Sequence, residues 1–220
     1  MRRFLCCLAV LTAIAALPAF ADIGFSVNNC LPATPSGCTT TQAGATTITF
    51  DGLDGTLTPY TSGIATYSWT GGGSPFVTGN NSTYAAPPDD TTTYLTVGSA
   101  GSYPEEVDIN FSVPLVYFGF YLGSPDSYNL IVFNRGAQIA TFDGTTLIPP
   151  ANGNQGIGDF VNFYVSGSYT PFDEIVMTSA TPAFETDNHA YVAAVPEPAS
   201  VLGLGTILLF LGSALKRKWA

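Results

Sequence analysis

The sequence predicts an all-β fold, a single antiparallel β-sandwich of the jelly-roll type, and three observations support it. The chain is rich in Thr, Ser, Gly, Tyr and Phe, a composition that suits strands and turns. Short segments of alternating apolar and polar residues recur between turn residues from residue 45 onward. No segment of this region keeps a helical period for more than two turns. Residues 22–194 are numerous enough to form one such domain.

The strands are expected in chain order after a short cysteine-containing segment. Cys30 and Cys38 flank Pro and Gly residues; in an exported chain they are expected to form a disulfide, with a pair of free thiols as the alternative. Asn134-Arg135-Gly136 predicts a tight hairpin turn. About nine to eleven strands at this spacing are typical of a sandwich. Their predicted ranges are 46–50, 65–70, 92–97, 106–113, 116–122, 128–133, 138–142, 162–165, 174–179 and 190–194.

The first 21 residues have the pattern of an export signal peptide. Arg2 and Arg3 form a positive start, residues 4–17 are apolar, and Ala19-Phe20-Ala21 is a small-x-small cleavage site. Cleavage is therefore expected between Ala21 and Asp22. A retained membrane helix is the alternative, although the apolar stretch is short for one.

The last residues, 195–220, have the pattern of a membrane-associated sorting tail. Pro196-Glu197-Pro198 cannot continue a helix, so this segment is expected to be extended and accessible. Residues 199–215 form an apolar run near the lower length limit for a transmembrane helix. Lys216-Arg217-Lys218 would remain cytoplasmic by the positive-inside rule. A simple C-terminal membrane anchor is the alternative interpretation.

The Pro196-Glu197-Pro198 motif is followed by an apolar helix and then by a basic end. This order at the C-terminus resembles the PEP-CTERM sorting domain. The resemblance implies recognition of Pro196, Glu197 and Pro198 by an exosortase, transient anchoring in the inner membrane, and removal of the tail. Proteins of this kind come from bacteria with an outer membrane that make exopolysaccharide, and they are passed to the cell surface or matrix. Three internal segments, 111–120, 122–130 and 183–190, are similar to a family of exosortase-dependent surface proteins, for which the resemblance implies no catalytic residue.

Charge excludes one class of partner. Of the six basic residues only Arg135 lies outside the two ends, so residues 22–195 carry one basic and fifteen acidic residues, a net charge of −14. Such a surface repels nucleic acid phosphates, and nucleic-acid binding is not expected. It would stay soluble and could attract divalent cations.

Catalytic signals are weak, and the chain is predicted not to be an enzyme. His189 is the only histidine; no Gly-x-Ser-x-Gly nucleophile elbow accompanies it, and one histidine cannot build a histidine-based metal site. Paired carboxylates could still hydrolyse a sugar bond, which leaves a secreted polysaccharide hydrolase as an alternative function. The candidate carboxylates are Glu105, Glu106, Asp108, Glu174 and Glu185.

Oxygen-rich segments suggest a calcium site as the one candidate cofactor site. Asp51 and Asp54 follow an early strand, and Glu185 and Asp187 precede the last one. First and last strands can be neighbours in a jelly roll, so these carboxylates could together bind Ca²⁺. The alternative is that they cap turns through side-chain hydrogen bonds.

The sequence thus predicts an exported surface or matrix protein that could contact exopolysaccharide. An adhesin or self-assembling coat protein is a further alternative. Exposed aromatic rings would suit glycan binding, although a sandwich core also needs large inward residues. The candidate rings are Tyr60, Tyr67, Trp69, Tyr84, Tyr94 and Tyr103.

Overall fold

The computed structural model describes residues 23–28, 30–55, 58–71, 73–98, 105–166 and 171–195. The predicted signal peptide with its cleavage bond, the Pro196–Pro198 motif, the predicted transmembrane helix 199–215 and Tyr103 lie outside these residues. Within the described part, no helix is both long and apolar enough to cross a membrane.

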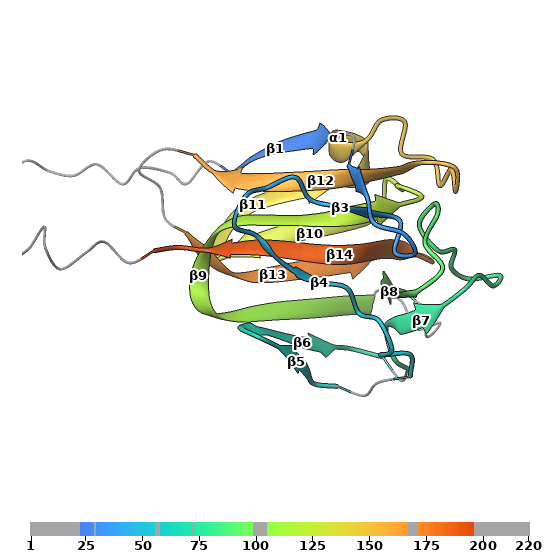
Figure 1. Ribbon diagram of the computed structural model, residues 1–220, viewed down its shortest axis with the longest axis horizontal. Coiled ribbons are helices and arrows are strands. Elements are labelled where there is room, and N and C mark those ends of the chain that lie inside the picture. Colours follow the sequence, from blue (N-terminus) through green and yellow to red (C-terminus); the bar gives the residue numbers. More distant parts are fainter. Residues whose placement is uncertain are drawn as a thin grey trace, which may run out of the picture.

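The described chain is almost entirely β-structure, which confirms the all-β prediction (Figure 1). Its one helix, α1 (Gly144–Leu147), is a single turn that begins at Asp143, whose carboxylate accepts a hydrogen bond from the Thr146 amide at 2.7 Å. The strands are β1 (Ile23–Asn28), β2 (Leu31–Pro32), β3 (Cys38–Thr39), β4 (Thr46–Ile48), β5 (Tyr60–Ser62), β6 (Ala65–Trp69), β7 (Phe76–Thr78), β8 (Thr93–Val97), β9 (Glu105–Gly123), β10 (Asn129–Asn134), β11 (Gln138–Asp143), β12 (Gly158–Val165), β13 (Phe172–Ser179) and β14 (Phe184–Ala193).

One long strand, β9, organises a curled antiparallel sheet. Its first half pairs with β6 and β13, and its second half pairs with β12 and β14. The ladder with β13 shifts register between Phe172 and Glu174, opposite the part of β9 that contains Pro114, a residue without an N–H donor. The prediction of two separate strands, 106–113 and 116–122, was therefore wrong, because the chain bends here without leaving the sheet.

The inner face of the curled sheet encloses an aromatic core. Alternate residues of β9, including Phe118 and Phe120, point into it, as period-two strand geometry requires. The rings of Phe133 and Phe163 lie 4.8 Å apart between centroids. Apolar burial of this extent is the main contribution to the stability of the domain.

The outer face of β9 and β14 is covered as well. β3 contacts β9, β12 and β14, and Tyr117, Tyr121, Phe160, Ala190 and Cys38 form a second apolar cluster there. The loop 79–92 packs against the same face, and a Cβ atom on Gly123 would lie 2.8 Å from the Pro87 Cα. Only glycine permits this close approach of loop and strand.

The first and last strands of the domain begin and finish at one end of the sheet, and most of the loops lie at the other end. β1 begins and β14 ends at the left of Figure 1, whereas the loops after β9 and before β14 lie at the right. We call this right-hand end, formed by loop 79–92 and the segments 124–128, 149–157 and 180–184, the loop end. The position of β12 and β14 beside β9 makes Gly123, Gly158 and Glu185 neighbours there.

Candidate functional site

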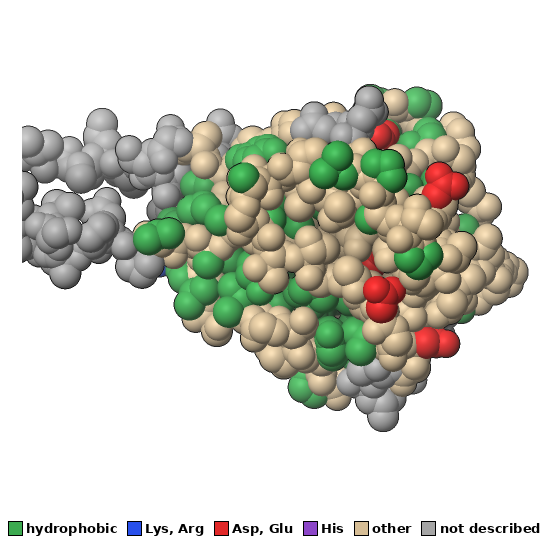
Figure 2. Space-filling view, in the orientation of Figure 1, with side chains coloured by type: hydrophobic (Ala, Val, Ile, Leu, Met, Phe, Trp, Pro, Cys, Tyr) green, Lys and Arg blue, Asp and Glu red, His purple; other side chains and the backbone are tan. Residues whose placement is uncertain are grey.

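A polar pocket of about 300 Å³ lies at the loop end. Its lining combines hydroxyl, amide and carboxyl groups from four segments distant in sequence, including Tyr84, Ser124, Asp126, Tyr128 and Glu185. On the face shown in Figure 2, the visible acidic side chains also gather toward this end. Such a lining suits a ligand with many hydroxyl groups, because each can exchange hydrogen bonds with the wall.

Glu185 forms part of this pocket and holds its wall in place. It is 3 % exposed; its Oε1 accepts a hydrogen bond from the Ala85 amide at 3.1 Å, and its Oε2 accepts one from the Ser124 hydroxyl at 2.6 Å. Burial raises the pKa of Glu185 to about 7, although both hydrogen bonds favour the ionised form. The carboxylate therefore connects β14 to the loop 79–92 and to the turn after β9.

Asp126 is the second carboxyl group of the pocket. Its Oδ2 accepts a hydrogen bond from the Tyr128 hydroxyl at 2.7 Å, and the same hydroxyl lies 2.8 Å from the Pro182 carbonyl. Partial burial raises the pKa of Asp126, while the tyrosine contact lowers it. Asp126 also lies close to Gly153, where a Cβ atom would be 3.0 Å from its Oδ1.

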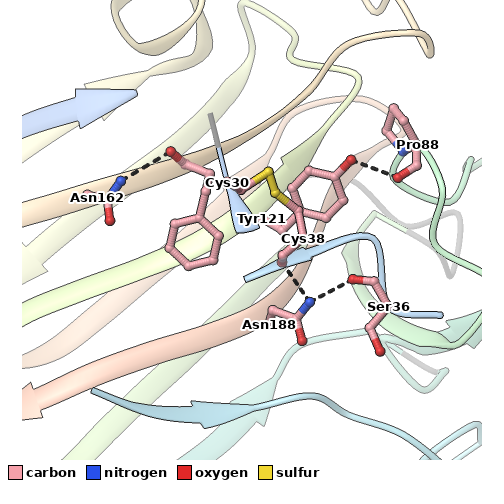
Figure 3. The surroundings of a disulfide bond; sticks show 8 residues. Cys30, Ser36, Cys38, Pro88, Tyr121, Asn162 and Asn188 are labelled. Atoms are coloured by element: carbon pink, nitrogen blue, oxygen red, sulfur yellow. Dashed lines mark hydrogen bonds between the residues drawn. A yellow bond between two sulfur atoms is a disulfide. The ribbon is translucent and has the colours of Figure 1, made fainter. Parts of the chain in front are cut away.

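Asn188 connects β14 to the disulfide-containing segment (Figure 3). Its amide nitrogen donates to the carbonyls of Ser36 at 2.6 Å and Cys38 at 2.7 Å. The structure joins Cys30 to Cys38 by a disulfide with a Cα–Cα distance of 5.5 Å. Asn188 has a φ of 51°, a left-handed conformation that asparagine tolerates better than most residues.

Asp187 lies between these two connections and has no partner of its own. It is fully buried, and neither of its carboxylate oxygens accepts a hydrogen bond. Burial and the neighbouring carboxylate of Asp90 raise the pKa of Asp187 to about 10. Asp90 is also buried and has one unpartnered oxygen, Oδ2.

His189 belongs to the core rather than to a catalytic site. It is completely buried, and its ring lies among Phe50, Phe118 and Phe120. The Tyr67 hydroxyl is 3.1 Å from its Nδ1, and the Thr186 hydroxyl is 2.9 Å from its Nε2. Burial lowers the pKa of His189 to about 3, so the imidazole is neutral and inaccessible to a substrate.

The four carboxylates predicted for calcium do not gather into one group. Asp51 and Asp54 are exposed, Glu185 is held by hydrogen bonds, and the buried oxygens of Asp187 have no hydrogen-bond partner. Among the residues that the structure describes, no three His, Cys, Asp or Glu side chains are close enough to hold a metal ion. Sequence reasoning missed Asp90, because it lies in the Pro- and Asp-rich segment 87–90 between the predicted strands 65–70 and 92–97.

The residues predicted for a hydrolase and for an aromatic glycan-binding surface do not gather in the polar pocket either. Of the five carboxylates proposed for a hydrolase, only Glu185 lines the polar pocket. Glu105 accepts a hydrogen bond from the Gly98 amide, and Glu174 accepts one from the side-chain amide of Asn134. Glu106 and Asp108 lie on β9. Of the predicted aromatic platform, Tyr67 and Tyr94 are buried. Tyr60, Trp69 and Tyr84 are half-buried, and only Tyr84 borders the pocket.

No protein-family model matches this chain, and no curated protein is similar to it.

Proposed function

We propose that this chain is an exported cell-surface or matrix protein, a jelly-roll-like β-sandwich that an exosortase sorts and processes through its C-terminal tail. The signal peptide at residues 1–21 would direct export, and residues 199–215 would anchor the precursor in the inner membrane. Cleavage near Pro196, Glu197 and Pro198 would then release the domain to the surface of a bacterium with an outer membrane. The curled sheet, whose two groups of strands share β9 and one core, supports the sandwich interpretation.

The observation that carries this proposal is that the C-terminal end of β14 and the polar pocket lie at opposite ends of the domain. β14 ends at one end of the domain, and the segments that line the pocket belong to the opposite, loop end (Figure 1). A domain tethered through its C-terminus would therefore present the loop end outward. We infer that the pocket contacts exopolysaccharide there, because its wall combines hydroxyl, amide and tyrosine groups.

The sorting route is tested by measuring the mass of the mature C-terminus in cells with and without the exosortase. We expect the mature protein to end near residue 196 only where the enzyme is present. Replacing Glu197 with Gln or Pro196 with Ala should preserve residues 199–220 in the mature protein. A mature form that keeps Leu215 in cells with the enzyme contradicts the sorting proposal.

Glycan binding is tested separately with matched variants of one residue type. Gln155 borders the pocket, whereas Gln138 is exposed on β11 outside its lining. On an array of acidic and neutral polysaccharides, Gln155→Ala and Tyr128→Phe should weaken binding, and Gln138→Ala should not. Absence of binding to every glycan by the unaltered protein would eliminate the exopolysaccharide contact but not the sorting route.

A secreted polysaccharide hydrolase is the second candidate, favoured by one observation. Glu185 and Asp126 line the same pocket, and the pKa of Glu185, about 7, would suit a general acid. Both oxygens of Glu185, however, already accept hydrogen bonds, which favours a structural role. Release of reducing sugar ends that Glu185→Gln abolishes, with the fold unchanged by circular dichroism, would favour the enzyme.

A further inference from the structure

Three carboxylate oxygens at the loop end have no partner in the protein, and they belong to two facing side chains. Both oxygens of Asp187 are unpartnered, and so is Oδ2 of Asp90. Asp187 is 0 % exposed and Asp90 is 6 % exposed, so water does not solvate them freely. The other oxygen of Asp90 accepts hydrogen bonds from the amide and hydroxyl of Thr92, each at 2.8 Å. The backbone of Asp90 pairs with Ser36, whose carbonyl accepts a hydrogen bond from Asn188, so Asp90 lies near Asp187. Buried carboxyl oxygens without partners are strongly unfavourable unless a proton or a cation neutralises the group.

No side chain in the described part of the chain supplies a positive charge to the pair. Arg135 is its one Lys or Arg residue; it lies in the turn after β10, and its guanidinium donates to the Pro171 carbonyl at 3.0 Å. His189 is neutral, because burial lowers its pKa to about 3, and its ring nitrogens contact Tyr67 and Thr186. The pair is therefore neutralised either by a proton or by a cation that binds from solvent.

We propose that Asp187 and Asp90 together bind one hard divalent cation, with Ca²⁺ as the preferred ion. Carboxylate oxygens are the ligands that Ca²⁺ takes in proteins, and two carboxylates balance its charge. A site without sulfur or imidazole ligands disfavours zinc and copper. Because only two acidic side chains take part, backbone carbonyls and water complete the coordination, which suits the variable geometry of Ca²⁺ better than the strict octahedron of Mg²⁺.

A cavity that opens to solvent lies beside Asp90. Asp90 lines an open cavity of about 490 Å³ with neighbouring residues of its loop, including Pro88, Asp89 and Thr91. The surrounding surface is acidic, which concentrates cations near the opening. An ion could thus reach Asp90 from solvent and then Asp187 behind it.

Cation binding would fix the loop 79–92 to β14. Three consecutive connections would then hold the covering segments on this strand. Glu185 contacts Ala85 and Ser124, the cation would join Asp187 to Asp90, and Asn188 contacts the segment 33–38. The site does not depend on the proposed sorting or glycan contact, because it is built from groups within the domain.

The test compares the processed protein in EDTA and in excess Ca²⁺ by calorimetry. If the ion is about 100-fold above its Kd, the melting temperature should rise by about 5–10 °C. Asp187→Asn and Asp90→Asn should each abolish this rise, and Asp173→Asn, a control on β13, should preserve it. In parallel, Ca²⁺ should slow proteolytic cleavage within residues 79–92, and terbium luminescence sensitised by Tyr121, the register neighbour of Asp187, should disappear in Asp187→Asn.

Two results would overturn the proposal. If Ca²⁺ leaves the melting temperature of the unaltered protein unchanged and Asp187→Asn is at least as stable, the two carboxyl groups share a proton instead. If Ca²⁺ stabilises Asp187→Asn as much as the unaltered protein, the ion binds elsewhere. Should Asp187→Asn fail to fold, Ca²⁺-dependent protection of residues 79–92 in the unaltered protein, lost in Asp90→Asn, decides the question.

Discussion

Replacement of Asn188 tests how β14 holds the disulfide-containing segment. The amide nitrogen donates two short hydrogen bonds, to the carbonyls of Ser36 and Cys38, and the side chain is 1 % exposed. Asn188→Gly removes both bonds and keeps the left-handed backbone accessible, since φ is 51°. A buried hydrogen bond contributes about 0.5–1.5 kcal/mol, and carbonyls left without a partner add a desolvation cost. We therefore expect Asn188→Gly to lower the free energy of unfolding by about 2–3 kcal/mol.

Two further substitutions at the same position separate the backbone from the side chain. Asn188→Ala should cost about 1 kcal/mol more than Asn188→Gly, because a Cβ atom is unfavourable in the left-handed region. Asn188→Asp should be the least stable of the three, since its carboxylate would face two carbonyl oxygens instead of donating to them. These variants thus predict one order of stability, Gly above Ala above Asp.

Urea unfolding of the processed protein, followed through the fluorescence of Trp69 on β6, measures these differences. For a domain of this size each 1 kcal/mol corresponds to about 2–4 °C in melting temperature, so Asn188→Gly should melt about 4–12 °C lower. If Asn188→Asp is as stable as Asn188→Gly, the amide does not donate to these carbonyls, and the reasoning about this connection fails.

Three further predictions concern the same covered strands. Gly123→Ala should destabilise the domain by about 1–3 kcal/mol and expose the loop 79–92 to protease, because the new methyl group would meet the Cα of Pro87 at 2.8 Å; an unchanged cleavage rate would contradict this close packing. Reduction of the Cys30–Cys38 disulfide, which closes a loop with a sequence separation of 8, should lower the free energy of unfolding by about 2–3 kcal/mol in urea; equal stability of oxidised and reduced protein would refute the expectation. Tyr67→Phe should cost about 1–3 kcal/mol by leaving a buried imidazole nitrogen without its hydroxyl partner; a change within experimental error would show that this contact contributes nothing.

The strand pattern of the chain was largely predictable, because one face of most strands packs on a single core. The alternation of Val107, Ile109 and Phe111 indicated a strand, and all three are buried in the core cluster. The length of β9 was not predictable, because a proline usually interrupts a strand. Here Pro114 lies at a bend within the continuous strand. β1 was missed because its residues lie next to the cysteine segment and pair with a strand more than one hundred residues later.

The polar row of β14 shows why the candidate site was harder to predict than the fold. Glu185 and Asp187 alternate with Phe184 and Thr186, a pattern that normally places acidic side chains in water on the outer face of a sheet. Here a second layer, formed by the loop 79–92 and the segment 30–45, buries that outer face. Sequence periodicity reports only which residues share a face, so it does not distinguish a solvated face from a covered one.

That covering layer determines what each acidic or amide group must do. Glu185 and Asn188 have backbone and hydroxyl partners on the segments that cover them, and their burial is compensated by hydrogen bonds. Asp187 is as deeply buried, its oxygens have no hydrogen-bond partner, and the charged groups near it, Asp90 and Asp51, are both carboxylates. Arg135, the one Lys or Arg among the described residues, is bound elsewhere, so a proton or a bound cation has to neutralise this pair. If the cation does so, the stability of the loop end should respond to the ionic composition of the medium, a property that follows from the extreme shortage of basic residues between the two ends of the chain.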